Sequence, residues 1–192
     1  MRPAWHFLAP RLGPVVFILI GAPLLLAVYL DQPPPARTGG FGEQTCQECH
    51  WGTVNDPAGS LTLKGLPKSY APTHEYSLNV TVQHPDLRRG GFQLSARFAR
   101  GDRTGEQAGH LHPLDESVEI LKESNSQVEY AVHTRKASRP AAASTASWSL
   151  VWEAPPSSRP VAFHLAANAA NDDDSPLGDF IYTLSIVKSA TE

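Results

Sequence analysis

Apolar and polar residues alternate with a period of two along most of the chain after Tyr70. The alternating apolar positions are Tyr76, Leu78, Val80 and Val82, then Phe92, Leu94, Ala96 and Phe98, then Val128, Tyr130 and Val132, then Trp148, Leu150 and Trp152, then Val161, Phe163 and Leu165. An apolar run from Phe180 to Val187 alternates more weakly, and a weaker strand is expected at 117–121. A period of two is typical of strands with one buried face. We therefore expect six or seven strands in an all-β fold, an antiparallel β-sandwich.

The first 31 residues have the pattern of a membrane-targeting segment. An apolar run from Gly13 to Leu30 follows basic residues at Arg2 and Arg11. The run is about long enough to cross a hydrocarbon core of ~30 Å. A cleaved signal peptide has the same order of charge and apolarity, but bulky residues stand before Asp31 where signal peptidase prefers small ones. We expect a single-pass anchor in the cell membrane, with the chain after Asp31 periplasmic or extracellular.

Three further segments follow the membrane segment. Residues 32–45 are rich in Pro and Gly, so we expect an extended, flexible linker. Residues 46–68 are expected to be short and irregular, and residues 69–189 to form the sandwich.

Composition narrows the classes of function. Apolar residues make up 41% of the chain and charged residues 18%, which favours a packed core over disorder. The formal net charge is −3 and the basic residues form no run. The chain therefore lacks the positive surface that nucleic-acid binding requires, and no nucleic-acid partner is expected.

One motif carries specific chemistry. Residues 46–50 read Cys-Gln-Glu-Cys-His, the C-x-x-C-H pattern of covalent haem attachment. Two thiols at this spacing add to the two vinyl groups of the porphyrin, and the adjacent His50 reaches the iron as the proximal ligand. Cys46 and Cys49 are the only cysteines in the chain. Their place beyond an export segment favours a single covalent haem c over other interpretations.

Three other interpretations of the motif have less support. A zinc site needs a fourth ligand from elsewhere in the chain, because Cys46, Cys49 and His50 supply three. A redox disulfide of the C-x-x-C type is usual at a strand-to-helix junction, which the pattern here lacks, and a structural disulfide closing so small a loop stabilises little.

The second axial ligand of the iron is less determined by the sequence. Met1 is the only methionine and lies before the membrane segment, so His/Met ligation within the chain is excluded. Strand parity turns His133 away from Val128, Tyr130 and Val132, and we expect it to face outward as the first candidate for a distal ligand. His84 is a second candidate, at a strand end beside a proline. For either residue, an ordinary hydrogen-bonding histidine is the competing interpretation.

Several segments together resemble the reelin-domain (Reeler) family. These are Tyr70-Ala71-Pro72, Tyr76–Val80, Gly90–Leu94, Trp152–Pro155, Val161–Phe163, Ala166–Asn171 and Gly178–Thr183. The exported part is similar to the bacterial choice-of-anchor V relatives, some of which carry C-x-x-C-H ahead of the sandwich. The resemblance implies an Ig-like β-sandwich and a surface or anchored protein, and it implies no defined activity. It also implies that His133, followed by Thr134, can be structural, because the pair recurs in relatives without the haem motif.

The expected function follows from the cofactor. A membrane-anchored monohaem c-type cytochrome would transfer single electrons on the outer side of the membrane, from redox partner proteins or quinol-linked complexes. This interpretation makes the chain an electron-transfer protein rather than an enzyme. One alternative is an extracytoplasmic adhesion or ligand-binding module in which the haem is structural or sensory, and another is a five-coordinate haem enzyme or gas binder.

Overall fold

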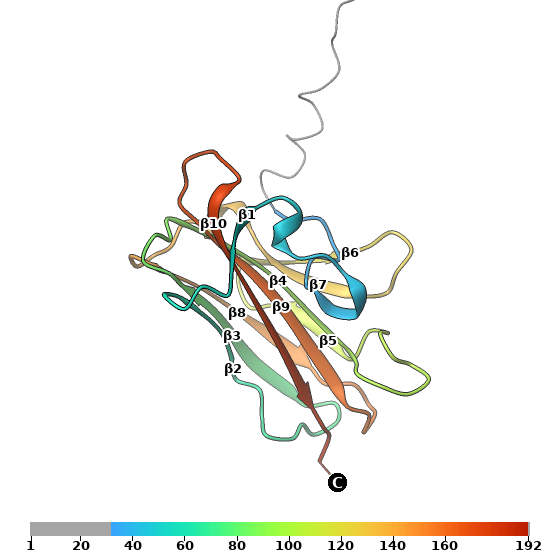
Figure 1. Cartoon of the computed structure of the whole chain (residues 1–192). Helices are drawn as coiled ribbons and strands as arrows, with labels where there is room; N and C mark the ends of the chain where they lie inside the picture. Colours follow the sequence, from blue (N-terminus) through green and yellow to red (C-terminus); the bar gives the residue numbers. More distant parts are fainter. Residues whose placement is uncertain (1–31, 192) are drawn as a thin grey trace, which may run out of the picture.

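The computed structural model describes residues 32–191 as two packed β-sheets (Figure 1). The first sheet has the strand order β1 (Trp51–Val54), β10 (Leu177–Lys188), β9 (Val161–Ala170), β4 (Arg89–Phe98), β7 (Glu129–His133) and β6 (Val118–Lys122). The second has the order β2 (Ser60–Lys64), β3 (Glu75–Gln83), β8 (Thr145–Glu153) and β5 (His110–Pro113). Strand β1 pairs with β10 in parallel, and the other neighbouring strands pair antiparallel. The prediction of an all-β sandwich is confirmed.

The core lies between the two sheets and is built from the alternating positions. In β3, Leu78, Val80 and Val82 are buried against Trp148, Leu150 and Trp152 of β8, and the inner residues of β4 and β9 close the other side. The two indoles keep their N–H groups satisfied, as buried tryptophans usually do. Trp148 Nε1 donates to the Ala137 carbonyl and Trp152 Nε1 donates to the Ala108 carbonyl, at 3.1 and 3.0 Å. Alternation therefore identified the core faces of these four strands correctly.

Strand β7 departs from the predicted parity. Ala131 belongs to the core between the sheets, whereas the hydroxyl of Tyr130 reaches Glu43 on the outer face of the first sheet. Both faces of β7 are covered, so every residue from Val128 to Val132 is buried. In a strand buried on both faces, apolar residues occupy both faces, so a period of two does not show which residues face the core. The expectation that Tyr130 and Val132 face the sandwich interior was wrong.

Residues 32–45 do not form a free linker. This segment, here called the strap, lies across the outer face of β4, β7 and β9 and includes a 3₁₀ turn, η2 (Gly40–Gly42). The backbone N–H of Arg37 donates to the side-chain oxygen of Gln93, and Gln93 Nε2 donates back to the Pro34 carbonyl at 2.8 Å. Thr38 is buried. The expected extended linker is replaced by a segment packed on the sheet.

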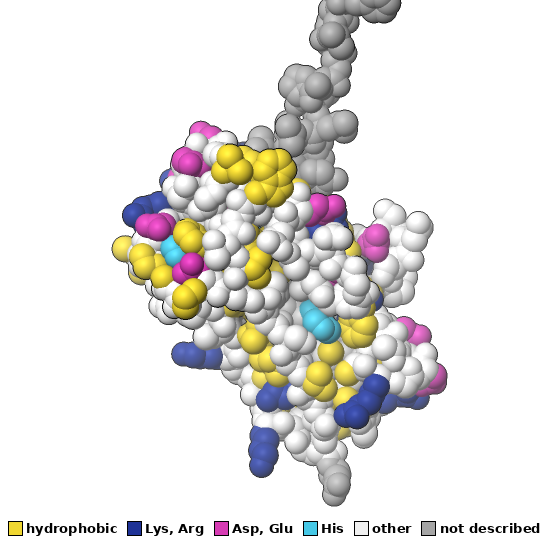
Figure 2. All heavy atoms as spheres, in the orientation of Figure 1, with side chains coloured by type: hydrophobic (Ala, Val, Ile, Leu, Met, Phe, Trp, Pro, Cys, Tyr) yellow, Lys and Arg dark blue, Asp and Glu magenta, His cyan; other side chains and the backbone are white. Residues whose placement is uncertain are grey.

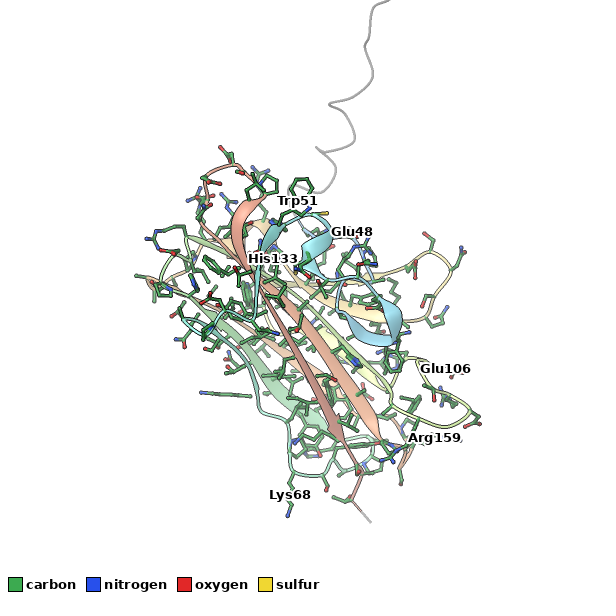
Figure 3. The ribbon with its side chains drawn as sticks, in the orientation of Figure 1. Glu48, Trp51, Lys68, Glu106, His133 and Arg159 are labelled. Carbon is green, nitrogen blue, oxygen red and sulfur yellow. The ribbon has the colours of Figure 1, made fainter. Side chains whose placement is uncertain are left out.

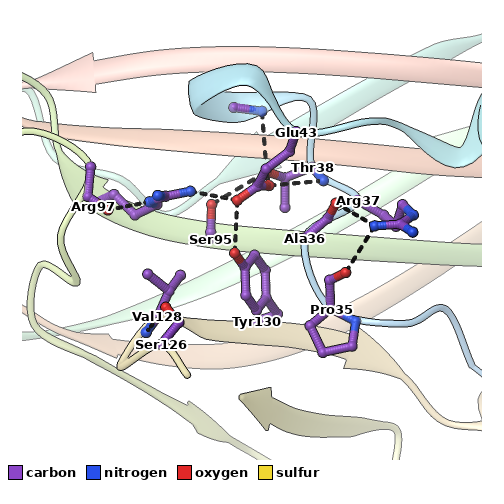
Figure 4. A network of polar contacts seen from close by, with 12 residues as sticks. Pro35, Ala36, Arg37, Thr38, Glu43, Ser95, Arg97, Ser126, Val128 and Tyr130 are labelled. Atoms are coloured by element: carbon purple, nitrogen blue, oxygen red, sulfur yellow. Dashed lines mark hydrogen bonds and ion pairs between the residues drawn. The ribbon is translucent and has the colours of Figure 1, made fainter. Parts of the chain in front are cut away.

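A buried ion pair fastens the strap to the sheet (Figure 4). Glu43 and Arg97 form an ion pair, and their side chains are 9% and 14% exposed. Tyr130 Oη donates to Glu43 Oε1 at 2.7 Å, and Thr38 Oγ1 bonds the other carboxylate oxygen. Burial, with the Glu43 carboxylate next in importance, raises the pKa of Tyr130, so the phenol stays protonated and donates. The network gives Glu43 a full set of partners away from water.

Residues 46–68 are also more regular than expected. After the 3₁₀ turn η3 (Cys46–Glu48), this segment contributes β1 to the first sheet and β2 to the second. It is therefore part of the sandwich, and no boundary separates it from residues 69–189. Strands β1, β2 and β5 are four or five residues long, and the sequence pattern did not predict them.

The membrane-anchor prediction falls on residues 13–30, which lie outside the described residues. Within residues 32–191, no helix is long and apolar enough to cross a membrane.

Candidate functional site

The C-x-x-C-H motif folds into a single helical turn. Thr45 caps this turn, because its Oγ1 accepts a hydrogen bond from the Gln47 N–H at 3.2 Å. The Cys46 carbonyl accepts from the N–H groups of Cys49 and His50, at 3.2 and 2.9 Å. Residues three and four positions apart in a helical turn lie on one side of it. The turn thus gathers two thiols and one imidazole on one side before the chain enters β1.

These three side chains line a cavity of about 230 Å³ at one end of the sandwich. The same cavity is lined by Gly91 of β4 and His133 of β7, and by Gln32 and Arg37 of the strap. Figure 3 shows His133 beside the turn that carries Glu48, below Trp51. Pockets that enclose a small ligand usually measure about 300–1,000 Å³. A porphyrin placed here would therefore stay partly outside the protein.

His50 is held in one orientation by a buried carboxylate. Its Nδ1 lies 2.6 Å from Oδ2 of Asp179, whose side chain is 2% exposed. An imidazole bonded to a carboxylate through Nδ1–H keeps the lone pair of Nε2 for a metal. Asp179 lies 129 residues along the chain from His50, on β10. The sequence did not single out Asp179 as a site residue, because the contact depends on the parallel pairing of β1 with β10.

His133 occupies the gap where β4 and β7 separate. These strands pair only at Gln93–Val132 and Leu94–Ala131, and Nδ1 of His133 then lies 3.1 Å from the nitrogen and 3.4 Å from the oxygen of Phe92. The His133 ring thus bonds the Phe92 backbone where a residue of a paired strand would otherwise do so. It lies beside the core aromatics Phe92 and Trp148. The expectation that parity turns His133 to an outer surface was therefore wrong. The ring reaches the cavity from the open end of the strand pair.

Two properties of His133 suit it to bind a metal ion. Desolvation lowers the pKa of His133 to about 4, with smaller contributions from His50 and Arg89, so the ring is neutral at pH 7. With Nδ1 on the Phe92 backbone, no residue of the range 32–191 hydrogen-bonds Nε2. Gly91 makes room for the ring, because a Cβ at this position would lie 2.6 Å from His133 Cε1.

The cysteines do not have the character of a redox pair. Both are free thiols, and Cys49 is exposed. Desolvation, with a smaller contribution from Cys49, raises the pKa of Cys46 to about 12, whereas reactive C-x-x-C thiols have a lowered pKa. Within residues 32–191, no three His, Cys, Asp or Glu side chains are grouped so that they could hold a metal ion by themselves. The disulfide-exchange and zinc interpretations gain no support from this geometry.

Two guanidinium groups border the same cavity. Arg37 forms an ion pair with Glu48, and Arg89 Nε lies 2.7 Å from Oδ1 of Asp172. Arginine forms paired hydrogen bonds with carboxylates. Both residues are placed where they could also meet an acidic ligand.

The structure does not bring His84 to the cavity. His84 is buried, its ring stacks on Phe180 with centroids 3.7 Å apart, and its Nδ1 accepts from the Asp86 N–H at 3.1 Å. His164 lies under the strap, with its ring centroid 5.0 Å from that of Phe41. Of the histidines in the described part of the chain, only His50 and His133 line the cavity.

An exposed apolar patch lies beside the motif. Trp51 and Leu177 are 64% and 57% exposed, and they pair across β1 and β10. Apolar side chains are visible at this end of the molecule in Figure 2, and Figure 3 places Trp51 there. Trp51 follows His50 directly, so the patch adjoins the cavity.

No protein-family model matches the chain, and no curated protein sequence matches it. Among solved structures, the human F-spondin reeler domain is similar at 25% identity, with a TM-score of 0.45 over 72% of this chain and 95% of that chain. The reelin-N domain of F-spondin is similar at 21% identity, with a TM-score of 0.46 over 77% and 96% of the two chains.

A cohesin module of a Clostridium perfringens family 33 glycoside hydrolase is similar at 11% identity, with a TM-score of 0.45 over 70% of this chain and 98% of that chain. The similar structures thus include reeler domains, the family that the sequence resembles. Because each of these TM-scores is below 0.5, the architecture of the chain rests on its own strand pairing and its function on its own cavity.

Proposed function

We propose that the chain is a monohaem c-type cytochrome that carries single electrons outside the cytoplasm. The observation that carries this proposal is the shared cavity, which Cys46, Cys49 and His50 line from one helical turn. Asp179 bonds Nδ1 of His50, and no residue of the range 32–191 hydrogen-bonds its Nε2. Covalent haem attachment requires these three groups on one side of the backbone.

The residues present fit a haem in four respects. Cys46 and Cys49 would hold it through thioether bonds, and His50 would bind the iron through Nε2. His133 lines the same cavity and has no hydrogen-bond partner for Nε2 among residues 32–191, so it is the best candidate for the second axial ligand. Arg37 and Arg89 would supply positive charge near the propionates. The haem supplies the one-electron chemistry, and the protein sets its exposure and potential.

The modest size of the cavity supports electron transfer over catalysis. A haem that is partly outside the protein can approach a redox partner closely, and Cys49 and Trp51 lie exposed at this edge. Two axial histidines would leave the iron no open position for a substrate. The apolar patch of Trp51 and Leu177 offers a contact surface beside the exposed edge.

A membrane anchor at residues 13–30 would hold the cavity close to the lipid surface. Gln32 lines the cavity, and the apolar run ends at Leu30, two residues earlier. Two extended residues span only about 7 Å. If residues 13–30 cross the membrane, the haem must lie near the lipid surface, where a tryptophan such as Trp51 is favoured.

The full chain, produced together with a c-type haem maturation system, tests this proposal. We expect the haem absorption in the membrane fraction, with a low-spin spectrum that is reversibly reduced and reoxidised. The same absorption in a soluble chain beginning near Asp31 would contradict the anchor. A high-spin spectrum that shifts with carbon monoxide would favour gas binding, and a haem that no quinol-linked enzyme reduces would favour the adhesion or sensory alternative.

A further inference from the structure

Asp179 is a buried carboxylate whose side-chain partner from the motif is the imidazole of His50. Its side chain is 2% exposed, and among the described residues its only ion pair is with His50. No lysine or arginine of residues 32–191 is paired with Asp179. Burying a carboxylate is costly unless it is paired and hydrogen-bonded. The hydrogen bond with the His50 ring therefore offsets part of the desolvation cost of burying Asp179.

The surrounding strands fix the position of this carboxylate. Asn168 Nδ2, on β9, donates to Oδ2 at 3.3 Å, and the backbone N–H of Asn171 donates to Oδ1 at 3.4 Å. Gly52 of β1 packs on the Asp179 backbone so closely that a Cβ would lie 1.4 Å from the Asp179 carbonyl oxygen. Any side chain at position 52 would push β1 away from β10. The carboxylate thus meets His50 from a rigid support.

We propose that Asp179 is a positioning residue that fixes the His50 proton on Nδ1, presents Nε2 to the iron and lowers the reduction potential of the haem. This inference rests on the proposed haem function. A carboxylate that accepts the Nδ1–H bond makes the imidazole a stronger electron donor, which stabilises the more positively charged, oxidised iron. Asn168 moderates this effect, because it donates to the same carboxylate oxygen that faces His50.

Substitutions of Asp179 and of Asn168 should shift the reduction potential in opposite directions. In the haem-loaded full chain, Asp179→Asn should raise the midpoint potential, since the carboxylate charge is removed. A tenfold change in the relative stability of the two redox states equals about 59 mV for one electron. Asn168→Ala should lower the potential, because the carboxylate loses a competing donor and its full charge acts on His50.

Asp174→Asn is the matched control. Asp174 is exposed in the loop before β10, so its replacement removes the same charge without touching His50. The control should leave the potential equal to that of the unmodified chain. Equal shifts in Asp179→Asn and Asp174→Asn would overturn the proposal, as would an unchanged potential in Asp179→Asn.

The remaining outcomes are also decisive. If the Asp179→Asn protein does not incorporate haem, the potential of the Asn168→Ala protein tests the proposal. A potential that is higher than that of the unmodified chain, or equal to it, overturns the proposal. An unmodified chain that carries no covalent haem contradicts the proposed function itself, and the mass of the protein reveals that result before any potential is measured.

Discussion

Replacing His133 by alanine is expected to convert the haem-loaded protein from a low-spin to a high-spin form that binds carbon monoxide. We infer that Nε2 of His133 is the second axial ligand, because it lines the same cavity as His50 and has no partner in residues 32–191. Without this ring the iron loses a strong-field ligand. The variant also leaves the Phe92 N–H without its acceptor, which costs about 1–3 kcal/mol of stability.

His133→Met provides a second test with a side chain of similar bulk. Methionine in place of histidine should keep the iron low-spin and raise the reduction potential, because Met/His ligation raises the potential of c-type haem. His84→Ala is the control, since His84 stacks on Phe180 away from the cavity and should not change the spectrum. A His133→Ala protein with an unaltered low-spin spectrum would exclude His133 as the ligand.

Replacing Glu43 by glutamine is expected to lower the free energy of unfolding by about 3 kcal/mol. The substitution leaves the Arg97 guanidinium, 14% exposed, without its ion-pair partner. Breaking a buried pair from one side typically costs about 3–5 kcal/mol, because a charge remains away from water. In a domain of this size each kcal/mol lowers the melting temperature by about 2–4 °C. Calorimetry or denaturant unfolding measures the change.

The chain offers a matched exposed pair as the control for Glu43. Arg103 and Glu106 are 46% and 55% exposed with a 2.7 Å contact. An exposed pair contributes about 0–1 kcal/mol, so Glu106→Gln should be nearly neutral. Equal stability losses in the two variants would show that the strap is not fastened by the buried network.

Alternation identified the core-facing residues of four strands, including β4 and β9 whose outer faces are also largely buried, and it failed for β7. Strands β3, β4, β8 and β9 bury the residues that the period of two assigns to the core. Strand β7 lies under the strap, so its apolar residues point both ways. The Pro and Gly content of the strap predicted a linker. The contacts that fix it, made by Thr38 and Glu43, are with residues more than 50 positions away and leave no local pattern in the sequence.

The sequence identified one side of the candidate site and missed the other. Cys46, Cys49 and His50 form a contiguous motif, and the structure brings them to one cavity. Asp179 was not predicted as a partner of His50, because that contact depends on the pairing of β1 with β10. His133 was selected on a parity argument that the structure contradicts, although its ring does line the cavity.

The mass of the intact, denatured chain tests the central claim most directly. The full chain and a Cys46→Ala, Cys49→Ala variant are each matured with a working c-type haem system, extracted with acidified acetone and weighed by mass spectrometry. The proposed function predicts that the unmodified chain keeps the mass of one haem and that the variant loses it. An unmodified chain that leaves the extraction without haem would contradict covalent attachment at Cys46 and Cys49.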